Sequence, residues 1–406
     1  MTTPHPASRP APATPAAPRR ALEPARDRGA PWTWEVAGYH EARRALSDHR
    51  LSKDPSLVWE VAAGAEGAGQ RWIRNIANTD PPEHTRLRRL LTAAFTRRRV
   101  EQMRPGIEQA ARRLADWLPP AAEVDLIASF AFPLQVEVTC DLLGVPSQHR
   151  EAFASLAAGM LAPGDGEHRP ASCHAAYQQL GTLMAEVLAA LRTGAARCSE
   201  VGIPEGPDGQ PHLLGALLAA RHGSDRLTEQ EAHAMAMLLI TAGQEPTIDL
   251  IANGVLALLL HPDQLQLVRR YPHLRASAVE ELLRYSVPVL AAPRIVAEDI
   301  EIDGTTVPRG SVLAVMLEAA HRDPAHFAAP DTLDITRDHN AHLAFGHGIH
   351  YCAGAPLARM QAAIAIGALV NRFPRISLAR TPEQLRWRPS WSARGLVELP
   401  VFLGPC

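Results

Sequence analysis

The hydrophobic pattern of the chain is mainly that of helices, and its clearest stretch begins at Thr228. Thr228 and Glu231 have the spacing of a capping box, and the apolar pattern behind them ends at His261-Pro262. A helix with these bounds has about 32 residues and a length of about 48 Å. Its middle, AMAMLLITAG, is apolar on every side, which predicts a helix through the centre of the molecule.

Other segments have shorter patterns of the same kind. The prolines after Asn78-Thr79-Asp80 favour the start of a helix over HTRLRRLLTAAF, and another helix is predicted from His273 to Ser286. Arg294 to Leu313 alternates and turns at Asp303-Gly304, which is typical of short strands in a hairpin. A further helix begins at Pro356. These patterns predict a mainly α protein with minor β sheets.

The first 31 residues differ from the rest, because they are almost entirely proline, alanine and arginine. Such a composition buries too little apolar surface to offset its ordering entropy, so residues 1–31 are predicted to be a disordered tail. Residues 32–406 contain no second segment of this kind and no internal repeat. We therefore expect one single large domain there.

Charge and cysteine usage narrow the class of ligand. The 41 basic and 43 acidic residues nearly cancel, which gives no reason to expect nucleic acid or an anionic membrane as a partner. The apolar run at 232–242 is too short to span a bilayer. Five cysteines without a CxxC pair argue against a disulfide framework, and a cytoplasmic location is expected. The expected ligand is a small molecule.

The most informative segment is FGHGIHYCAGAPLAR, residues 345–359. Its glycines let the backbone approach a flat ligand, and a helix start directly behind Cys352 would lower the pKa of the thiol. A thiolate in such a loop suits the axial position of a haem iron. Two alternatives remain from the residues alone. Cys352 could be an ordinary buried residue, or it could form a zinc site with His342, His347 and His350.

The segment FGHGIHYCAG matches the haem-binding signature FGxGxHxCxG at every fixed position, and the chain resembles the cytochrome P-450 family. The resemblance continues in order over nearly all of residues 35–403, through TDPPEHTRLRRL, ITAGQEPT, EELLR and APRIVAEDIEIDG. It implies the cytochrome P-450 fold, a haem b cofactor with Cys352 as the iron ligand, and a haem-lined loop that contains Phe345, Gly346, Gly348 and Gly354.

The resemblance also assigns roles to charged residues. Glu281 and Arg284 match the family's ExxR pair, which with Arg337 forms a structural network behind the haem; from spacing alone they could equally be a surface ion pair. The haem propionates need cationic partners in an apolar slot. The resemblance implies that these partners are His84, Arg88, Arg294 and His350. Other arginines nearby, such as Arg89, could simply form a solvated basic face.

The long helix departs from the family pattern (A/G)Gx(D/E)T(T/S). Gly243 would open a groove beside dioxygen and Glu245 would belong to a proton relay, but Pro246 stands where the first threonine is expected. Proline donates no hydrogen bond and predicts a kink. Thr247 is turned by about 100° around the helix, so its hydroxyl is not expected to replace the missing one.

Several outcomes stay open for the reaction. A substrate hydroxyl or a water could deliver protons, so that the enzyme hydroxylates or epoxidises its substrate with O2 and two electrons. The enzyme could instead couple aromatic groups or close a ring without inserting oxygen, the protein could bind haem without turnover, or Pro246 could have little effect.

No flavin or iron–sulfur module is visible in the chain, so a ferredoxin and a ferredoxin reductase are expected as electron donors. The resemblance places their docking on the cysteine side of the haem, near Arg86 to Arg99. The segments 58–76, 153–180 and 287–293 resemble substrate-contacting regions and suggest a partly apolar small molecule.

Overall fold

A computed structural model describes residues 22–24, 34–57, 74–161, 171–193, 212–220 and 225–404. Most of the predicted tail and most of the predicted substrate-contacting segment 58–76 lie outside these ranges. Within the predicted tail, Leu22–Pro24 form a strand, β1, that pairs with β2 (Trp34–Val36). A composition poor in large apolar residues argues against a buried core. It does not exclude backbone hydrogen bonds to a neighbouring strand.

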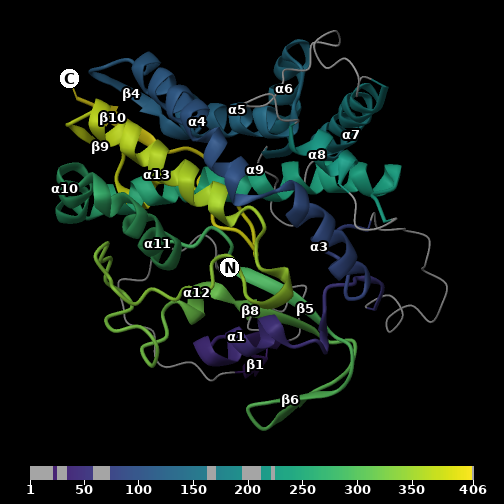
Figure 1. Ribbon diagram of the computed structural model, residues 1–406. Coiled ribbons are helices and arrows are strands. Elements are labelled where there is room, and N and C mark those ends of the chain that lie inside the picture. The colour runs from purple at the N-terminus through teal and green to yellow at the C-terminus, as the bar shows by residue number, and fades with distance from the viewer. Residues whose placement is uncertain are drawn as a thin grey trace.

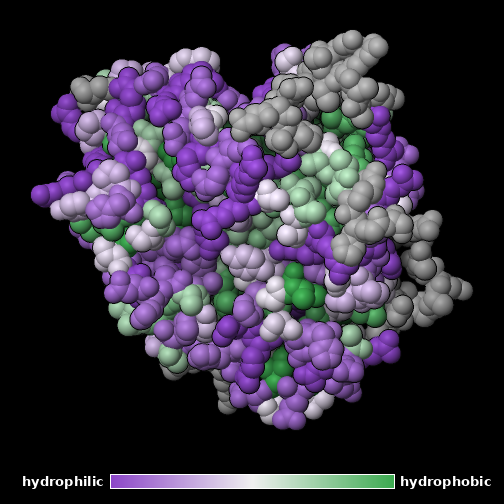
Figure 2. Space-filling view, viewed as in Figure 1, coloured by the Kyte–Doolittle hydropathy of each residue, from purple (hydrophilic) through white to green (hydrophobic). Residues whose placement is uncertain are grey.

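Helices make up most of the described chain, as the sequence predicts. They are α1 (Tyr39–Ser47), α3 (Glu83–Ala94), α4 (Arg97–Trp117), α5 (Phe132–Leu143), α6 (Arg150–Leu161), α7 (Ala171–Thr193), α8 (Leu213–Ala219), α9 (Glu229–Leu260), α10 (Pro262–Arg270), α11 (Arg275–Tyr285), α12 (Leu317–Ala320) and α13 (Ala355–Arg372). None of these described helices is long and apolar enough to cross a membrane. The face shown in Figure 2 is mostly hydrophilic, with hydrophobic residues in separate small patches.

The strands form three small sheets. The largest sheet has the order β1-β2-β8-β5-β3, where β8 is Val312–Met316, β5 is Ala291–Val296 and β3 is Leu51–Ser52. The second sheet has the order β4-β10-β9, with β4 at Ala122–Asp125, β10 at Pro400–Leu403 and β9 at Ile376–Leu378. The third sheet pairs β6 (Ile300–Ile302) with β7 (Thr305–Val307). The predicted turn joins β6 to β7, where Asp303 and Gly304 both have positive φ. Figure 1 shows the large sheet with α1 and α12 in one half of the molecule and most helices in the other.

Helix α9 is the central element that the sequence predicts. It begins behind the Thr228–Glu231 capping box and ends at His261. Its first half belongs to a hydrophobic cluster with α5, α7 and α8, whereas its second half belongs to another with α4, α11 and α13. The helix continues through Pro246 without a break. The polar stretch from Gly243 to Thr247 therefore lies where the two clusters meet.

The start of α3 has no side-chain cap. Pro82 takes the N-cap position and makes no side-chain cap, although the sequence offers three capping residues just before it. The Asp80 carboxylate instead accepts hydrogen bonds from the Ser52 hydroxyl and, at 3.1 Å, from the Lys53 amide. A long-range contact has thus replaced the local cap and ties α3 to the end of β3.

Candidate active site

The Cys352 loop comes directly before α13, and its conformation requires glycine at two positions. Gly346 and Gly348 have φ values of 76° and 74°, which favour glycine. A Cβ at Gly348 would lie 2.9 Å from the Leu46 carbonyl oxygen, so this glycine lets the loop pack against α1. The Cys352 amide donates to the Phe345 carbonyl at 2.9 Å, which closes the loop.

Cys352 lies in the loop directly before α13. The side chain is accessible, yet burial among protein atoms raises the pKa of the thiol; the amides of Gly354 and Ala355 and the charge of Arg88 lower it. The helix start therefore acts in the predicted direction, although the desolvation of an anion outweighs these contacts in the protein alone. Coordination by a metal cation would reverse the balance, since a coordinating thiol is deprotonated.

Nitrogen donors gather beside this loop and have few anionic partners. The rings of His84 and His350 lie 4.3 Å apart between centroids, and the buried Nε2 of His84 has no hydrogen-bond partner among the described residues. Burial lowers the pKa of Arg294 to about 10, and burial together with His84, Arg294 and Lys53 lowers that of His350 to about 3. Buried donors and cations of this kind need anions. They fit the two carboxylates of a haem.

Lys53 joins His84, Arg294 and His350 in what we call the cationic cluster, and it was not predicted from the sequence. It directly follows β3, whose Ser52 pairs with Ile295 of β5, so Lys53 lies next to Arg294 across the strands. Burial and the Arg294 charge lower the pKa of Lys53 to about 7. No local signal could have found it, because the pairing joins segments that are far apart in the chain.

One face of α9, formed by Ala242, Gly243, Glu245 and Pro246 and called the open face below, is more accessible than the residues that follow it. Ala242 is exposed, and Gly243, Glu245 and Pro246 are half-buried, whereas the residues from Thr247 to Leu258 are buried. The Thr247 hydroxyl donates to the Gly243 carbonyl at 2.8 Å. Because Pro246 has no amide hydrogen, the Ala242 carbonyl lacks its usual helical donor at this face.

Two buried glutamines that the sequence analysis did not single out connect α9 to α13. The Gln361 amide of α13 donates to Oε1 of Gln135 at 2.8 Å, and the Gln135 amide donates to the Gly243 carbonyl at 3.2 Å. The two glutamines thus link α13 to the backbone of α9 at Gly243.

Glu245 does not lie alone at the edge of this open face. Its carboxylate is 3.3 Å from Nη2 of Arg388, which also bonds the fully buried carboxylate of Asp249. Neither Arg388 nor Asp249 was predicted from the sequence, although an acidic residue within the apolar second half of α9 was a visible signal.

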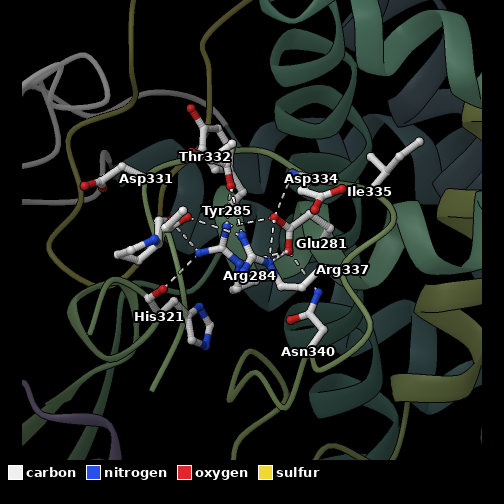
Figure 3. Close-up of polar contacts among 12 residues, drawn as sticks. Glu281, Arg284, Tyr285, His321, Asp331, Thr332, Asp334, Ile335, Arg337 and Asn340 are labelled. Carbon is white, nitrogen blue, oxygen red and sulfur yellow. Dashed lines mark hydrogen bonds and ion pairs between the residues drawn. The ribbon is translucent and has the colours of Figure 1, made fainter. Parts of the chain in front are cut away.

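Glu281 and Arg284 form a buried network with Arg337, as the resemblance implies. Both side chains of the pair are fully buried, and Arg284 donates to the Glu281 carboxylate at 2.8 and 2.9 Å. Arg337 Nε lies 3.1 Å from the same carboxylate. Figure 3 shows that the partners of this pair come from several segments; one of them is the carbonyl of His321, which accepts from Arg284. The alternative of a surface ion pair is therefore wrong.

The alternative of a zinc site is not supported. Within the part of the chain that the structure describes, no group of three histidine, cysteine or acidic side chains could hold a metal ion. His342 bonds Glu280 at 3.2 Å, His347 lines a separate surface pocket with His40, and His350 lies against His84.

Comparisons with known proteins agree with this geometry. The Cytochrome P-450 family model matches residues 264–386. Cytochrome P-450 107B1 of Saccharopolyspora erythraea is 43% identical, covering 91% of this chain and 89% of its own, and 6-deoxyerythronolide B hydroxylase of the same species is 40% identical, covering 91% and 90%.

A solved structure of the polyketide synthase cytochrome P-450 PksS of Bacillus subtilis has a TM-score of 0.80 at 33% identity, covering 91% of this chain and 90% of its own. The chain therefore belongs to the cytochrome P-450 family and is a haem-thiolate oxidoreductase.

Proposed function

We propose that the protein is a monooxygenase that hydroxylates or epoxidises a specialised small molecule, with haem b bound through Cys352. The observation that carries this proposal is the accessible sulfur at the start of α13 beside buried donors that lack anions, above all His84 Nε2. In this proposal His84, Arg88, Arg294 and His350 bind the propionates. Phe345, Gly346, Gly348 and Gly354 shape the loop around the sulfur.

Thiolate-bound haem activates dioxygen with two electrons and two protons, so that one oxygen atom enters the substrate and the other leaves as water. The chain must supply the protons at the open face of α9. Glu245 is the acid at the edge of this face. Thr247 cannot direct its proton there, because its hydroxyl donates to the Gly243 carbonyl.

The Ala242 carbonyl, to which Pro246 cannot donate, favours a substrate hydroxyl or an ordered water at this place. Such a donor would satisfy the carbonyl and replace the hydroxyl that Pro246 cannot offer. The names of the relatives, a 6-deoxyerythronolide B hydroxylase and a polyketide synthase enzyme, suggest a hydroxyl-bearing polyketide as the class to test first.

The electron donors are proposed to be a ferredoxin and its reductase. Arg97 and Arg98 at the start of α4 are exposed and suited to an acidic partner. Arg86 is not, because it is paired with Glu83, Asp225 and Glu231.

The first test is spectroscopic. The reduced protein under carbon monoxide should give the long-wavelength band of thiolate-bound haem, and Cys352→Ala should abolish it. If the band is absent from the unchanged protein, or survives in the variant, the proposed function is wrong.

The second test concerns the reaction. Polyketides that shift the Soret band should be incubated with a ferredoxin, its reductase, NADPH and heavy-isotope dioxygen. Incorporation of one heavy oxygen atom supports the monooxygenase. A product that has lost two hydrogens without gaining oxygen supports oxidative coupling or ring closure, the candidate that the missing hydroxyl at Pro246 favours.

A further inference from the structure

Lys53 is a half-buried cation that the proposed function leaves without a role. It follows β3 directly, and its backbone amide donates to the Asp80 carboxylate at 3.1 Å. Its ammonium group makes no hydrogen bond or ion pair with any residue that the structure describes. A lysine that is partly removed from water in this way needs an anion to compensate its charge.

The strand register places Lys53 against a second cation. Ser52 pairs with Ile295 where β3 and β5 run antiparallel, so the next position of the same register sets Lys53 opposite Arg294. Arg294 is only 4% exposed. Side chains at opposite positions are close neighbours, and like charges there destabilise a sheet. Burial and the Arg294 charge accordingly both lower the pKa of Lys53. The two cations need an anion that both can reach.

The acid beside them, Asp80, does not fill this need. Its charge acts on both Lys53 and Arg294, but its two oxygens accept from the Ser52 hydroxyl and from the backbone amide of Lys53. The Arg294 guanidinium donates to the Pro293 carbonyl at 2.9 Å and pairs with no carboxylate of the described residues. Both cations are therefore left without a carboxylate partner in this part of the protein.

The surroundings carry more positive than negative charge. Burial and the charge of Arg88 lower the pKa of His84, so Arg88 is a third cation beside Lys53 and Arg294. Against these three, Asp80 supplies one negative charge. The two carboxylates of a haem would balance the two positive charges that remain.

Lys53 also lies close to the loop that carries Cys352. Burial and the charges of His84, Arg294 and Lys53 lower the pKa of His350, which places the Lys53 ammonium near the His350 ring. Lys53 thus has two proposed propionate partners as neighbours, one across the strands and one in the cysteine loop.

We propose that the ammonium group of Lys53 binds a haem propionate, as a fifth partner in addition to the four that the proposed function names. The inference rests on the proposed haem site and deepens it. An ammonium carries three donors on one compact atom, which suits a carboxylate that other donors already surround, whereas the planar fork of an arginine takes more room.

The composition of the chain allows a direct test. Lys53 is the only lysine, since every other one of the 41 basic residues is an arginine. Protein labelled with nitrogen-15 at lysine Nζ should give one side-chain signal in nuclear magnetic resonance spectra of the diamagnetic ferrous carbon monoxide form. An ammonium bound to a carboxylate should keep its proton at about pH 9, because an adjacent anion favours the charged form. A titration near pH 7, as burial and Arg294 alone would give, overturns the proposal.

Haem transfer to apomyoglobin measures the contact in variants. Lys53→Met, which keeps the length but not the charge, should speed the transfer about tenfold, and Lys53→Arg should be slower than Lys53→Met. The matched control is Arg50→Met, because Arg50 lies just before β3 and pairs with Asp48 at 2.7 Å. The control should stay within about twofold of the unchanged protein. Equal rates for Lys53→Met and the unchanged protein would refute the contact.

A haem with esterified propionates separates this contact from a general effect on the fold. After reconstitution with protohaem dimethyl ester, Lys53→Met and the unchanged protein should lose the haem at equal rates, because no carboxylate is left for the ammonium. A tenfold difference that persists with the ester would assign Lys53 to the fold and contradict the proposal. The labelling test needs no variant, so it decides the question if Lys53→Met does not fold.

The carbon monoxide spectrum distinguishes failure of the proposed function from failure of this inference. An unchanged protein without the thiolate band would contradict the haem site itself. A thiolate band in both the unchanged protein and Lys53→Met, together with a titration near pH 7 and equal haem transfer, would exclude only Lys53 from the propionate site.

Discussion

The region behind Cys352 and the middle of α9 differ in how many donors their buried carboxylates have. Behind the cysteine loop, the Glu281 carboxylate accepts from Arg284, Arg337, Asn340 and the Asp334 amide. In α9, by contrast, two acids share one arginine and Pro246 removes a backbone donor. Four donors on one buried carboxylate suit a region that holds the fold, whereas two acids on one arginine leave the middle of α9 less completely compensated.

The sharpest test of this contrast is removal of Arg284. Arg284→Met should leave the Glu281 charge buried and poorly compensated, so the free energy of unfolding should fall by about 3–5 kcal/mol. Arg104→Met is the matched control, because Arg104 and Glu101 have the same spacing on α4 but are 44% and 50% exposed. The control should change stability by about 0.5 kcal/mol or less in urea unfolding. Similar losses in both variants would remove the distinction between the two regions.

Acid should weaken the region behind the cysteine loop through His321. Its Nε2 accepts the Leu343 amide at 2.8 Å, and burial together with His342 and Arg284 holds the pKa of His321 well below its usual value. The unfolded state then binds a proton that the folded state does not, so His321 costs stability as the pH falls below about 6.5, by about 1.4 kcal/mol per pH unit. Urea unfolding of His321→Gln at several pH values should show a shallower pH slope. An unchanged slope would exclude His321 as the cause.

Haem retention tests the cationic cluster between the two regions. His84→Leu should speed haem transfer to apomyoglobin about tenfold, because a charge-assisted hydrogen bond to a propionate is lost. Arg89→Leu, at an exposed position on the same helix, should change the rate by less than about twofold. Equal rates for the two variants would remove His84 from the propionate site.

The smallest effect is expected at Pro246. Pro246→Thr restores a hydroxyl and a backbone donor on α9, so product yield per NADPH should rise, and peroxide leakage fall, by roughly two- to threefold. The change is small because Glu245 already offers a partly exposed acid at the edge of this face. If both quantities stay unchanged with an accepted substrate, position 246 does not limit proton delivery.

Local signals in the sequence predicted much of the fold. The capping box at Thr228, the turn at Asp303-Gly304 and the helix start at Pro356 were confirmed, because each depends on residues within a few positions of one another. The loop signature around Cys352 was equally local. Asp80 stands just before α3 but does not cap it, since a distant partner, Ser52, donates to the same carboxylate.

The sequence by itself determined the main helices, the family and the residue proposed to bind the iron. Only the tertiary structure decided which polar groups are buried together: Lys53 beside Arg294, Gln135 between Gly243 and Gln361, and Asp249 on Arg388, 139 positions away. The physical reason is that helix caps and turns are satisfied by near neighbours, whereas the energy of a buried charge depends on partners that the fold brings together from distant segments.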